Sequence, residues 1–166
     1  MAAVELVNSG EDPETLLTID QVDAWYARHG YTGRRDRTDA ELADLRAVRP
    51  VLRELLMADR DTAAEMVNQM LADARAVPRL VRHDDIDWHI HAVSPDEPLV
   101  RRVLVETAMA MADVVRGDET SRLSVCADDT CAGIVLDLTR NRSRRFCSTT
   151  CANRVAVAAY RARRRG

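Results

Sequence analysis

The sequence of 166 residues predicts a mainly α-helical protein with small β-hairpins, built from two units. In several segments apolar residues recur every three or four positions behind a helix-capping residue. Residues 1–122 carry 24 acidic residues and 15 arginines, a net charge of −9, whereas residues 123–166 carry three and nine, a net charge of +6. All four cysteines lie in the basic part. These observations predict one unit over residues 1–120 and a second over residues 121–166.

The composition excludes several classes of protein. A hydrophobic content of 46% is typical of a globular chain, not of a disordered one. No apolar run approaches the ~18 residues that a membrane span needs, and the N-terminus lacks the basic region of a secretion signal. We therefore expect a cytoplasmic protein without a membrane partner. All 24 basic residues are arginine, a bias typical of a GC-rich bacterial genome.

The first elements are a short apolar segment and a capped helix. Residues 4–8 fit either a short helix or a short strand that closes the core. Thr18 and Gln21 have the spacing of a capping box, in which each side chain accepts from the backbone N–H of the other residue. Apolar residues follow at helical spacing, and Gly30 supplies a stop. This pattern predicts a helix from Ile19 to about Gly30.

The next helices begin with the same signal. Thr38 and Glu41 form a second predicted capping box, ahead of a leucine-rich stripe that continues past Pro50. Proline lacks a backbone N–H, so we expect the helix to kink or to restart there. Thr62 and Glu65 predict a third capping box and a third helix.

A β-hairpin and one long helix complete the first unit. Residues 79–83 and 88–93 have the composition of two short strands around an acidic turn at Asp84 and Asp85. Pro98 suits the first turn of a final helix, and Gly117 supplies its end.

Three histidines near this hairpin allow two interpretations. His89 and His91 share one face of the predicted strand, and His83 is close in sequence. A metal site would need ligands from elsewhere, and the spacing matches no metalloenzyme motif. We expect a surface-exposed strand face, with a ligand or metal site as the alternative. The chain has no glycine-rich phosphate loop and no nucleophile motif, so we expect no enzyme activity.

The strongest chemical signal is the spacing of the cysteines, which are Cys126, Cys131, Cys147 and Cys151. Two close pairs separated by a short insert suit a tetrahedral Zn²⁺. Two disulfides are the alternative, which a reducing cytosol disfavours. A unit of about 40 residues with few large apolar side chains needs such an ion to fold. Because all four ligands are sulfur, we expect one structural zinc ion.

A hairpin and a helix are expected around this ion. Residues 134–138 and 144–146 are predicted strands joined by a turn at residues 140–143, and Ser148 is the predicted N-cap of a helix running toward Arg165. This arrangement would be a treble-clef-like zinc finger with four cysteine ligands. The inward face of the helix is expected to comprise Cys151, Val155, Ala159 and Ala162.

The basic character of this unit indicates a polyanionic partner, for which DNA is the first candidate. Arginines of the predicted hairpin and helix would contact phosphates, and Asn153 and Arg154 are best placed for base edges. The alternative is that Asn153 and Arg154 brace the finger itself. The predicted nucleic-acid contacts are Arg140, Arg142, Arg144, Arg145, Asn153, Arg154, Arg161, Arg164 and Arg165.

Residues 144–154 read Arg-Arg-Phe-Cys-Ser-Thr-Thr-Cys-Ala-Asn-Arg, and with the upstream cysteines they resemble the CGNR zinc-finger family. Residues 6–9, Leu-Val-Asn-Ser, look like the opening motif of the helical ABATE domain that usually precedes this finger. The resemblance implies zinc ligands at the four cysteines, a signature polar pair at Asn153 and Arg154, and a stress-induced transcription regulator that binds DNA. The signature glycine is Ala152 here and the usual tryptophan is Phe146; on a helical backbone the alanine is harmless.

We therefore expect an acidic helical domain with a sensory or oligomerisation role, followed by a zinc finger that binds DNA; a protein partner or a homodimer is also expected as a candidate. The alternative is a protein-interaction module whose basic finger docks on an acidic protein surface, including that of its own N-terminal domain. We also expect the boundary near Asp118 to separate two cores.

Overall fold

The computed structural model describes residues 1–83 and 86–164, and it gives no account of the side chains of His83 and Ile86. The described chain is mainly helical with two small antiparallel hairpins, which confirms the predicted fold class. The elements are α1 (Ala2–Asn8), α2 (Ile19–Arg28), α3 (Asp39–Ala47), α4 (Arg49–Met57), α5 (Arg60–Asp73), β1 (Arg79–His83), β2 (Ile86–His91), α6 (Leu99–Arg116), a 3-10 turn (Thr120–Arg122), β3 (Leu123–Val125), β4 (Ile134–Leu136) and α7 (Thr149–Arg163).

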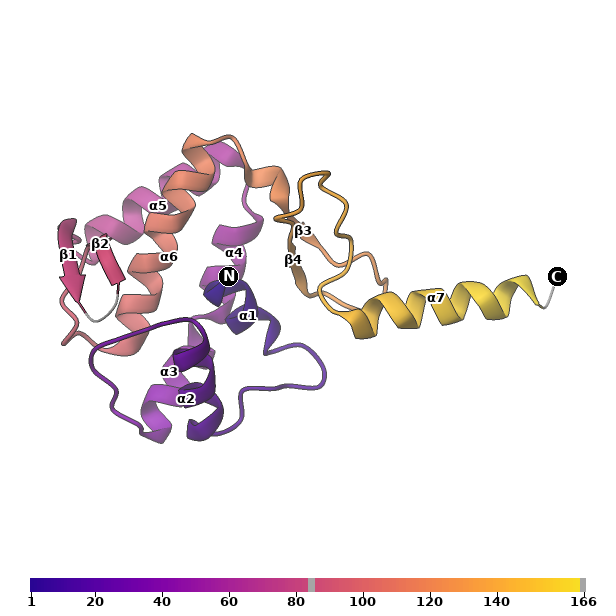
Figure 1. Ribbon diagram of the computed structural model, residues 1–166, viewed down its shortest axis with the longest axis horizontal. Coiled ribbons are helices and arrows are strands. Elements are labelled where there is room, and N and C mark those ends of the chain that lie inside the picture. Colours follow the sequence, from indigo (N-terminus) through magenta and orange to yellow (C-terminus); the bar gives the residue numbers. More distant parts are fainter. Residues whose placement is uncertain (84–85, 165–166) are drawn as a thin grey trace.

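The helices α1 to α6 and the first hairpin form a helical body, residues 1–118, from which the finger and α7 project (Figure 1). Within the body α5 packs along α6, and α1 packs on α4. Its core consists mainly of aliphatic side chains, because the chain has few aromatic residues. The fully buried side chains of this core include Leu6, Leu45, Leu52, Leu55, Leu99 and Val103. Among the described helices none is both long and apolar enough to cross a membrane.

Local capping signals place most helix starts where the sequence predicts them. At α2 both halves of the capping box form: Thr18 Oγ1 accepts from the Gln21 N–H at 3.3 Å, and Gln21 Oε1 accepts from the Thr18 N–H at 3.1 Å. The expected interruption at Pro50 is a restart, with the proline in the first turn of α4. Residues 4–8 belong to a helix, α1.

The predicted capping box at Thr62 is wrong. Helix α5 begins three residues earlier, and its N-cap is Asp59, whose carboxylate accepts from the N–H groups of Asp61 at 3.1 Å and Thr62 at 3.0 Å. The Thr62 hydroxyl donates to the same carboxylate at 2.9 Å. A carboxylate that satisfies two orphan N–H groups is a better cap than a hydroxyl that satisfies one, so the earlier residue sets the start.

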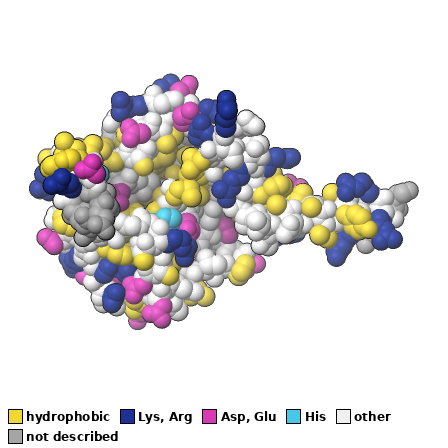
Figure 2. Space-filling view, viewed as in Figure 1, with side chains coloured by type: hydrophobic (Ala, Val, Ile, Leu, Met, Phe, Trp, Pro, Cys, Tyr) yellow, Lys and Arg dark blue, Asp and Glu magenta, His cyan; other side chains and the backbone are white. Residues whose placement is uncertain are grey.

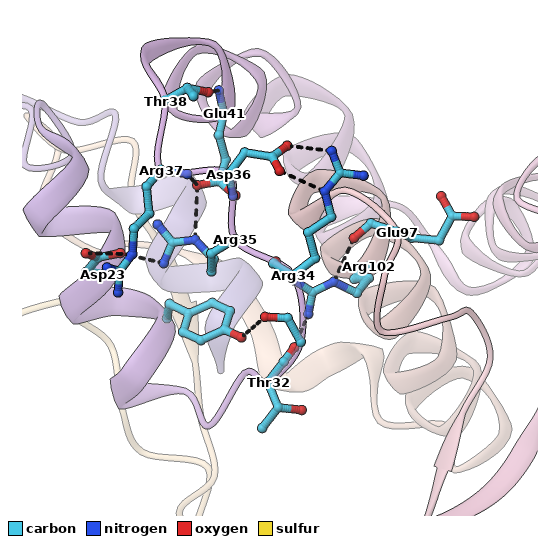
Figure 3. Close-up of polar contacts among 12 residues, drawn as sticks. Asp23, Thr32, Arg34, Arg35, Asp36, Arg37, Thr38, Glu41, Glu97 and Arg102 are labelled. Atoms are coloured by element: carbon cyan, nitrogen blue, oxygen red, sulfur yellow. Dashed lines mark hydrogen bonds and ion pairs between the residues drawn. The ribbon is translucent and has the colours of Figure 1, made fainter.

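A buried ionic cluster fixes the loop between α2 and α3 (Figure 3). Glu41 accepts from the backbone N–H groups of Asp36 and Arg37, both at 3.1 Å, and from Arg35 at 3.0 Å. Arg35 also pairs with Asp23 at 2.7 Å. From α6 the buried Arg102 donates to backbone carbonyls on both sides, including Glu97 O at 3.1 Å. Glu41 therefore orders this loop instead of closing a capping box with Thr38, so only half of the predicted second box forms.

The first hairpin turns its apolar side chains outward. Strands β1 and β2 pair antiparallel with Leu80 opposite Ile90, and the second strand lies two residues earlier than predicted. The turn at Asp84 and Asp85 lies outside the described residues. The exposed fractions of Leu80, Trp88 and Ile90 are 68%, 62% and 55%.

His89 and His91 lie on the other face of the strand and are half-buried. The expectation of a surface-exposed histidine face is therefore wrong, because the side chains that alternate with the histidines take the solvent side. The side chain of His83 lies outside what the structure describes.

The second hairpin differs from the predicted one in its pairing. Strand β4 pairs with β3, Leu123 opposite Leu136 and Val125 opposite Ile134, and not with residues 144–146. Residues 137–146 instead form a loop around Asp137, whose carboxylate accepts from the N–H groups of Thr139 and Arg144, both at 2.8 Å. Strand β4 needs no turn after it to reach its partner, because the cysteine loop between β3 and β4 brings the chain back beside β3.

The structure has two apolar clusters, one in the helical body and one around the cysteines, and strand β4 joins them. Ile134 of β4 is 1% exposed and belongs to the apolar cluster of the helical body. Its neighbour Val135, on the opposite face of the same strand, packs in the small cluster around Cys126 and Cys151. One strand thus contributes to both clusters, as the alternation of side chains along a strand allows.

Candidate metal centre and basic surface

The loop between β3 and β4 presents the first two cysteines. Cys126 follows β3 directly, and its N–H donates to Gly133 O at 2.8 Å, which folds the loop back on itself. At the tip Asp128 accepts from the Thr130 N–H at 3.1 Å and the Thr130 hydroxyl at 2.8 Å. These local bonds bring Cys131 back beside the start of the loop.

The start of α7 presents the other two cysteines. Ser148 is the N-cap, as predicted, and its hydroxyl accepts from the Cys151 N–H at 3.2 Å. Cys151 is buried in the first turn of the helix, and Cys147 lies just before the cap. The cap therefore fixes the spacing of this pair.

The four sulfurs lie in the geometry of a tetrahedral zinc site. All four Sγ atoms lie within 4.8 Å of one another, with Cys131 and Cys147 3.6 Å apart and Cys147 and Cys151 3.7 Å apart. Four Zn–S bonds of about 2.3 Å would place tetrahedral sulfurs about 3.8 Å apart. None of the four forms a disulfide. Within the described part of the chain, no other group of three or more ligating side chains lies this close together.

The electrostatics of the cluster also favour a bound cation. Burial and then the adjacent thiols raise the pKa of Cys147, and burial raises the pKa of Cys131. Four thiolates can share this volume only when a positive ion compensates them. Two backbone N–H groups already point at sulfur, from Gly133 to Cys131 at 3.3 Å and from Cys147 to Cys126 at 3.5 Å.

The chain matches two family models. The family model ABATE, described as "Putative stress-induced transcription regulator", covers residues 1–118. The chain belongs to the ABATE family. The model "CGNR zinc finger" matches residues 122–164, which include all four cysteines. This ABATE-family chain therefore carries one structural zinc ion in a CGNR zinc finger. No curated protein matches the sequence.

In this ABATE-family chain Arg154 contacts the finger itself. Its guanidinium pairs with Asp128 at 3.0 Å, donates to Thr130 Oγ1 at 2.9 Å, and lies 3.6 Å from Cys151 Sγ. The pKa of Asp128 is lowered, first by its hydrogen bonds from Thr130 and further by Arg154. Arg154 thus ties α7 to the first cysteine loop and offsets part of the −2 charge of a zinc tetrathiolate. Its neighbour Asn153 is exposed.

The other predicted contact residues fall into three groups. Arg142 donates to Ser121 and Glu119, both at 2.7 Å, and Arg144 donates to Phe146 O and Cys147 O. The guanidinium groups of Arg145 and Arg164 lie over aromatic rings, those of Phe146 and Tyr160. Arg140 and Arg161 are exposed, and their side chains form no hydrogen bond or ion pair with another described residue. Arg165 lies outside the described residues.

Most of α7 projects into solvent, contrary to the predicted inward face. Cys151 is buried and Val155 is half-buried, but Ala159 and Ala162 are exposed. The helix outruns the finger after its second turn, so nothing in the described chain remains for those alanines to pack against (Figure 1). Arg163 also lies on this exposed part, and the sequence analysis did not include it.

Side chains of the body bind the backbone of the finger at a joint for which the sequence carries no local signal. The side-chain amide of Asn8 donates to Ile134 O at 2.8 Å, and its Oδ1 accepts from the Ile134 N–H at 2.6 Å. Glu11 accepts from the Ala132 N–H at 3.2 Å, and Arg53 donates to Ala132 O. Asn8 therefore occupies the edge of β4 as a neighbouring strand would.

Proposed function

We propose that this protein binds double-stranded DNA through α7 and the loop of residues 138–146, and that it regulates transcription there. The observation that carries the proposal is the projecting helix: residues 138–164 contain eight arginines and no acidic residue. The visible face of α7 shows arginines beside apolar side chains, whereas acidic side chains lie over the helical body (Figure 2). Such a role belongs in the bacterial cytoplasm, where the chromosome lies.

The dimensions of α7 support a groove-binding role. Its 15 residues, at about 1.5 Å each, extend about 22 Å. The major groove is about 12 Å wide and admits an α-helix. The zinc site, the Ser148 cap and Arg154 hold the first two turns, and the residues after Val155 are exposed.

The free arginines support an external polyanion over the protein's own acidic domain. The body and the finger meet through Asn8, Glu11 and the backbone of β4, and the arginines of residues 138–164 do not take part in these contacts. Of these arginines, Arg142 pairs with Glu119 at the junction. Arg140, Arg161 and Arg163 remain for phosphates, and Asn153 for a base edge.

Fluorescence anisotropy with a mixed-sequence duplex at several salt concentrations tests the proposal. We expect tight binding at low salt, with log K falling by about 0.9 per phosphate contact for each unit of log salt. The double variant Arg161→Gln and Arg163→Gln should weaken binding and flatten this slope by about 1.8. Arg116→Gln, which changes an exposed arginine at the C-terminal end of α6, is the matched control.

No binding at low salt would reject DNA and favour an acidic protein as the partner of the finger. Binding that persists in the double variant with an unchanged slope would reject α7 as the contact surface. The zinc content of each variant, measured alongside, distinguishes a lost contact from a lost fold.

A further inference from the structure

The orientation of the first hairpin is the reverse of what burial alone would produce. In β2 the exposed fractions of Trp88 and Ile90 are 62% and 55%. His89 and His91, which alternate with them along the strand, are half-buried. A half-buried strand ordinarily turns its apolar residues inward and its polar residues to water. The histidines therefore hold their positions through interactions other than apolar packing.

The two imidazoles face each other through the same kind of atom. His89 Nε2 and His91 Nε2 lie 2.9 Å apart, and the ring centroids are 4.8 Å apart. Alternation along the strand places both rings on one side of the sheet. The Nε2 atoms of the two imidazoles therefore lie next to each other on the same face of the sheet.

The tautomer of His89 is fixed by the backbone. His89 Nδ1 lies 2.7 Å from the carbonyl oxygen of Asp87. A carbonyl oxygen only accepts, so the proton of the neutral ring is on Nδ1 and the lone pair is on Nε2. A ligating histidine commonly has this arrangement, with the second ring nitrogen bonded to a carbonyl group.

The separation of the nitrogens sets the angle at an ion between them. With bonds of about 2.05 Å, two nitrogens 2.9 Å apart subtend about 90° at the ion. Adjacent ligands of octahedral and tetragonal ions make this angle, whereas tetrahedral ligands need a wider one. Ni²⁺ and Cu²⁺ have these geometries and prefer imidazole nitrogen.

The surroundings allow an ion to enter and stabilise its charge. His91 lines a cavity of about 490 Å³ with Thr32, Arg79 and Pro95, which leaves room for water ligands. On α6 the carboxyl of Glu106 is half-buried, and this burial raises its pKa, whereas positive charge on Arg102 and His89 lowers it. A cation at the histidines would likewise favour the charged form of this carboxyl.

We infer that His89 and His91 form a second metal site, separate from the zinc cluster, that takes a divalent transition ion of octahedral or tetragonal geometry such as Ni²⁺ or Cu²⁺. The two Nε2 atoms supply adjacent ligands. Binding requires the His91 tautomer with its proton on Nδ1, and the ion then takes the place of the N–H···N bond between the rings. Neutral imidazoles hold a divalent ion more weakly than the four thiolates hold zinc.

Calorimetric titration of Ni²⁺ into the zinc-loaded protein, prepared without a histidine tag, tests this inference. We expect one Ni²⁺ per chain with the zinc retained, and at least about tenfold weaker binding in His89→Gln and in His91→Gln, since each variant leaves one ligand and removes the chelate. His29→Gln is the matched control, because His29 is also half-buried but pairs with Glu5. Electron paramagnetic resonance of the Cu²⁺ form should show coupling to two imidazole nitrogens in the wild type and to one in each variant.

Unchanged Ni²⁺ affinity in both glutamine variants would overturn the inference, as would the absence of binding in the wild type. Ni²⁺ that displaces the zinc would be recognised by thiolate charge-transfer bands and would also overturn it. Circular dichroism and zinc content establish that each variant is folded. His91→Asn replaces any glutamine variant that does not fold.

Discussion

At Gly133 the metal centre leaves no room for a side chain. A Cβ atom there would lie 3.0 Å from Cys147 Sγ and 3.3 Å from Cys131 Sγ, closer than ordinary van der Waals contact. Gly133→Ala should therefore push the two sulfurs apart and weaken zinc binding by at least about tenfold, since zinc tolerates little deviation in sulfur positions. Competition with a chromophoric chelator measures this affinity.

Ala152→Gly, which restores the family's signature residue, is the control for that substitution. Ala152 is inside α7 and has no positive φ, so the alanine suits its backbone. Glycine should lower the stability of the finger by about 0.5–1 kcal/mol and leave the zinc affinity unchanged. Equal zinc affinities for wild type and Gly133→Ala would show that the cluster adapts to the added methyl group.

Arg154 and Arg161 are expected to behave differently on substitution. Arg154→Ala removes an ion pair to the buried Asp128 and a hydrogen bond to Thr130, so it should lower both the melting temperature of the finger and its affinity for DNA. Arg161→Ala should lower DNA affinity alone, because its side chain contacts no described residue. Thermal melts and anisotropy titrations of both variants check this. An unchanged melt for Arg154→Ala would make Arg154 a nucleic-acid contact only.

At the level of elements, α7 consists of two anchored turns and an unsupported remainder. Isolated helices shorter than about 12–15 residues are marginal in water, and the residues after Val155 are exposed. A chain ended after Ala156 should keep its zinc and its melting temperature, yet lose DNA binding. Zinc content, a thermal melt and anisotropy measure the three properties. Lost zinc in the shortened chain would show that the distal turns stabilise the finger.

Elements with local signals were predictable, and elements with distant partners were not. The Thr18 box, the Ser148 cap and the restart at Pro50 each depend on a few neighbouring residues. The pairing of β4 depends on a loop that Cys126 and Cys131 close, so the sequence analysis assigned the nearer segment 144–146 instead. The zinc ligands were predictable because their spacing is itself the signal.

Contacts between residues that are far apart in the sequence have no comparable signal in the sequence. Asn8 and Ile134 are 126 residues apart, and a lone asparagine in an apolar segment does not indicate a strand partner. The outward face of the first hairpin was missed for a related reason: alternation defines two faces, but packing against the rest of the chain decides which is inward.

For the whole molecule, the shared strand predicts cooperative unfolding. Removal of zinc should lower the melting temperature of the helical body, because Ile134 belongs to its core. In a Trp88→Phe background the fluorescence of the buried Trp25 reports on the body alone. In the zinc-loaded protein, zinc release and the Trp25 signal should change at the same temperature. A chelator should lower the temperature of the Trp25 transition. A Trp25 transition that does not respond to the chelator would contradict a single cooperative unit.

Asn8→Ala should weaken this coupling. It removes two hydrogen bonds and leaves the backbone groups of Ile134 unpaired, which lowers the free energy of unfolding by about 2–4 kcal/mol. Urea unfolding followed by Trp25 fluorescence and by zinc release measures the effect. Asn68→Ala, at an exposed position on α5, is the control and should change stability by less than about 0.5 kcal/mol. Equal loss in the two variants would deny Asn8 its role at the joint.

The two hydrogen bonds between the Asn8 side chain and Ile134 of β4 also set the direction in which α7 points. Because the finger is bonded to the body rather than tethered by a loose linker, a rotation of the body turns the helix through the same angle. In a dimer formed through the helical bodies, the two helices would hold a fixed distance and inclination. The spacing between paired DNA half-sites would then be dictated by a part of the protein that never touches the duplex.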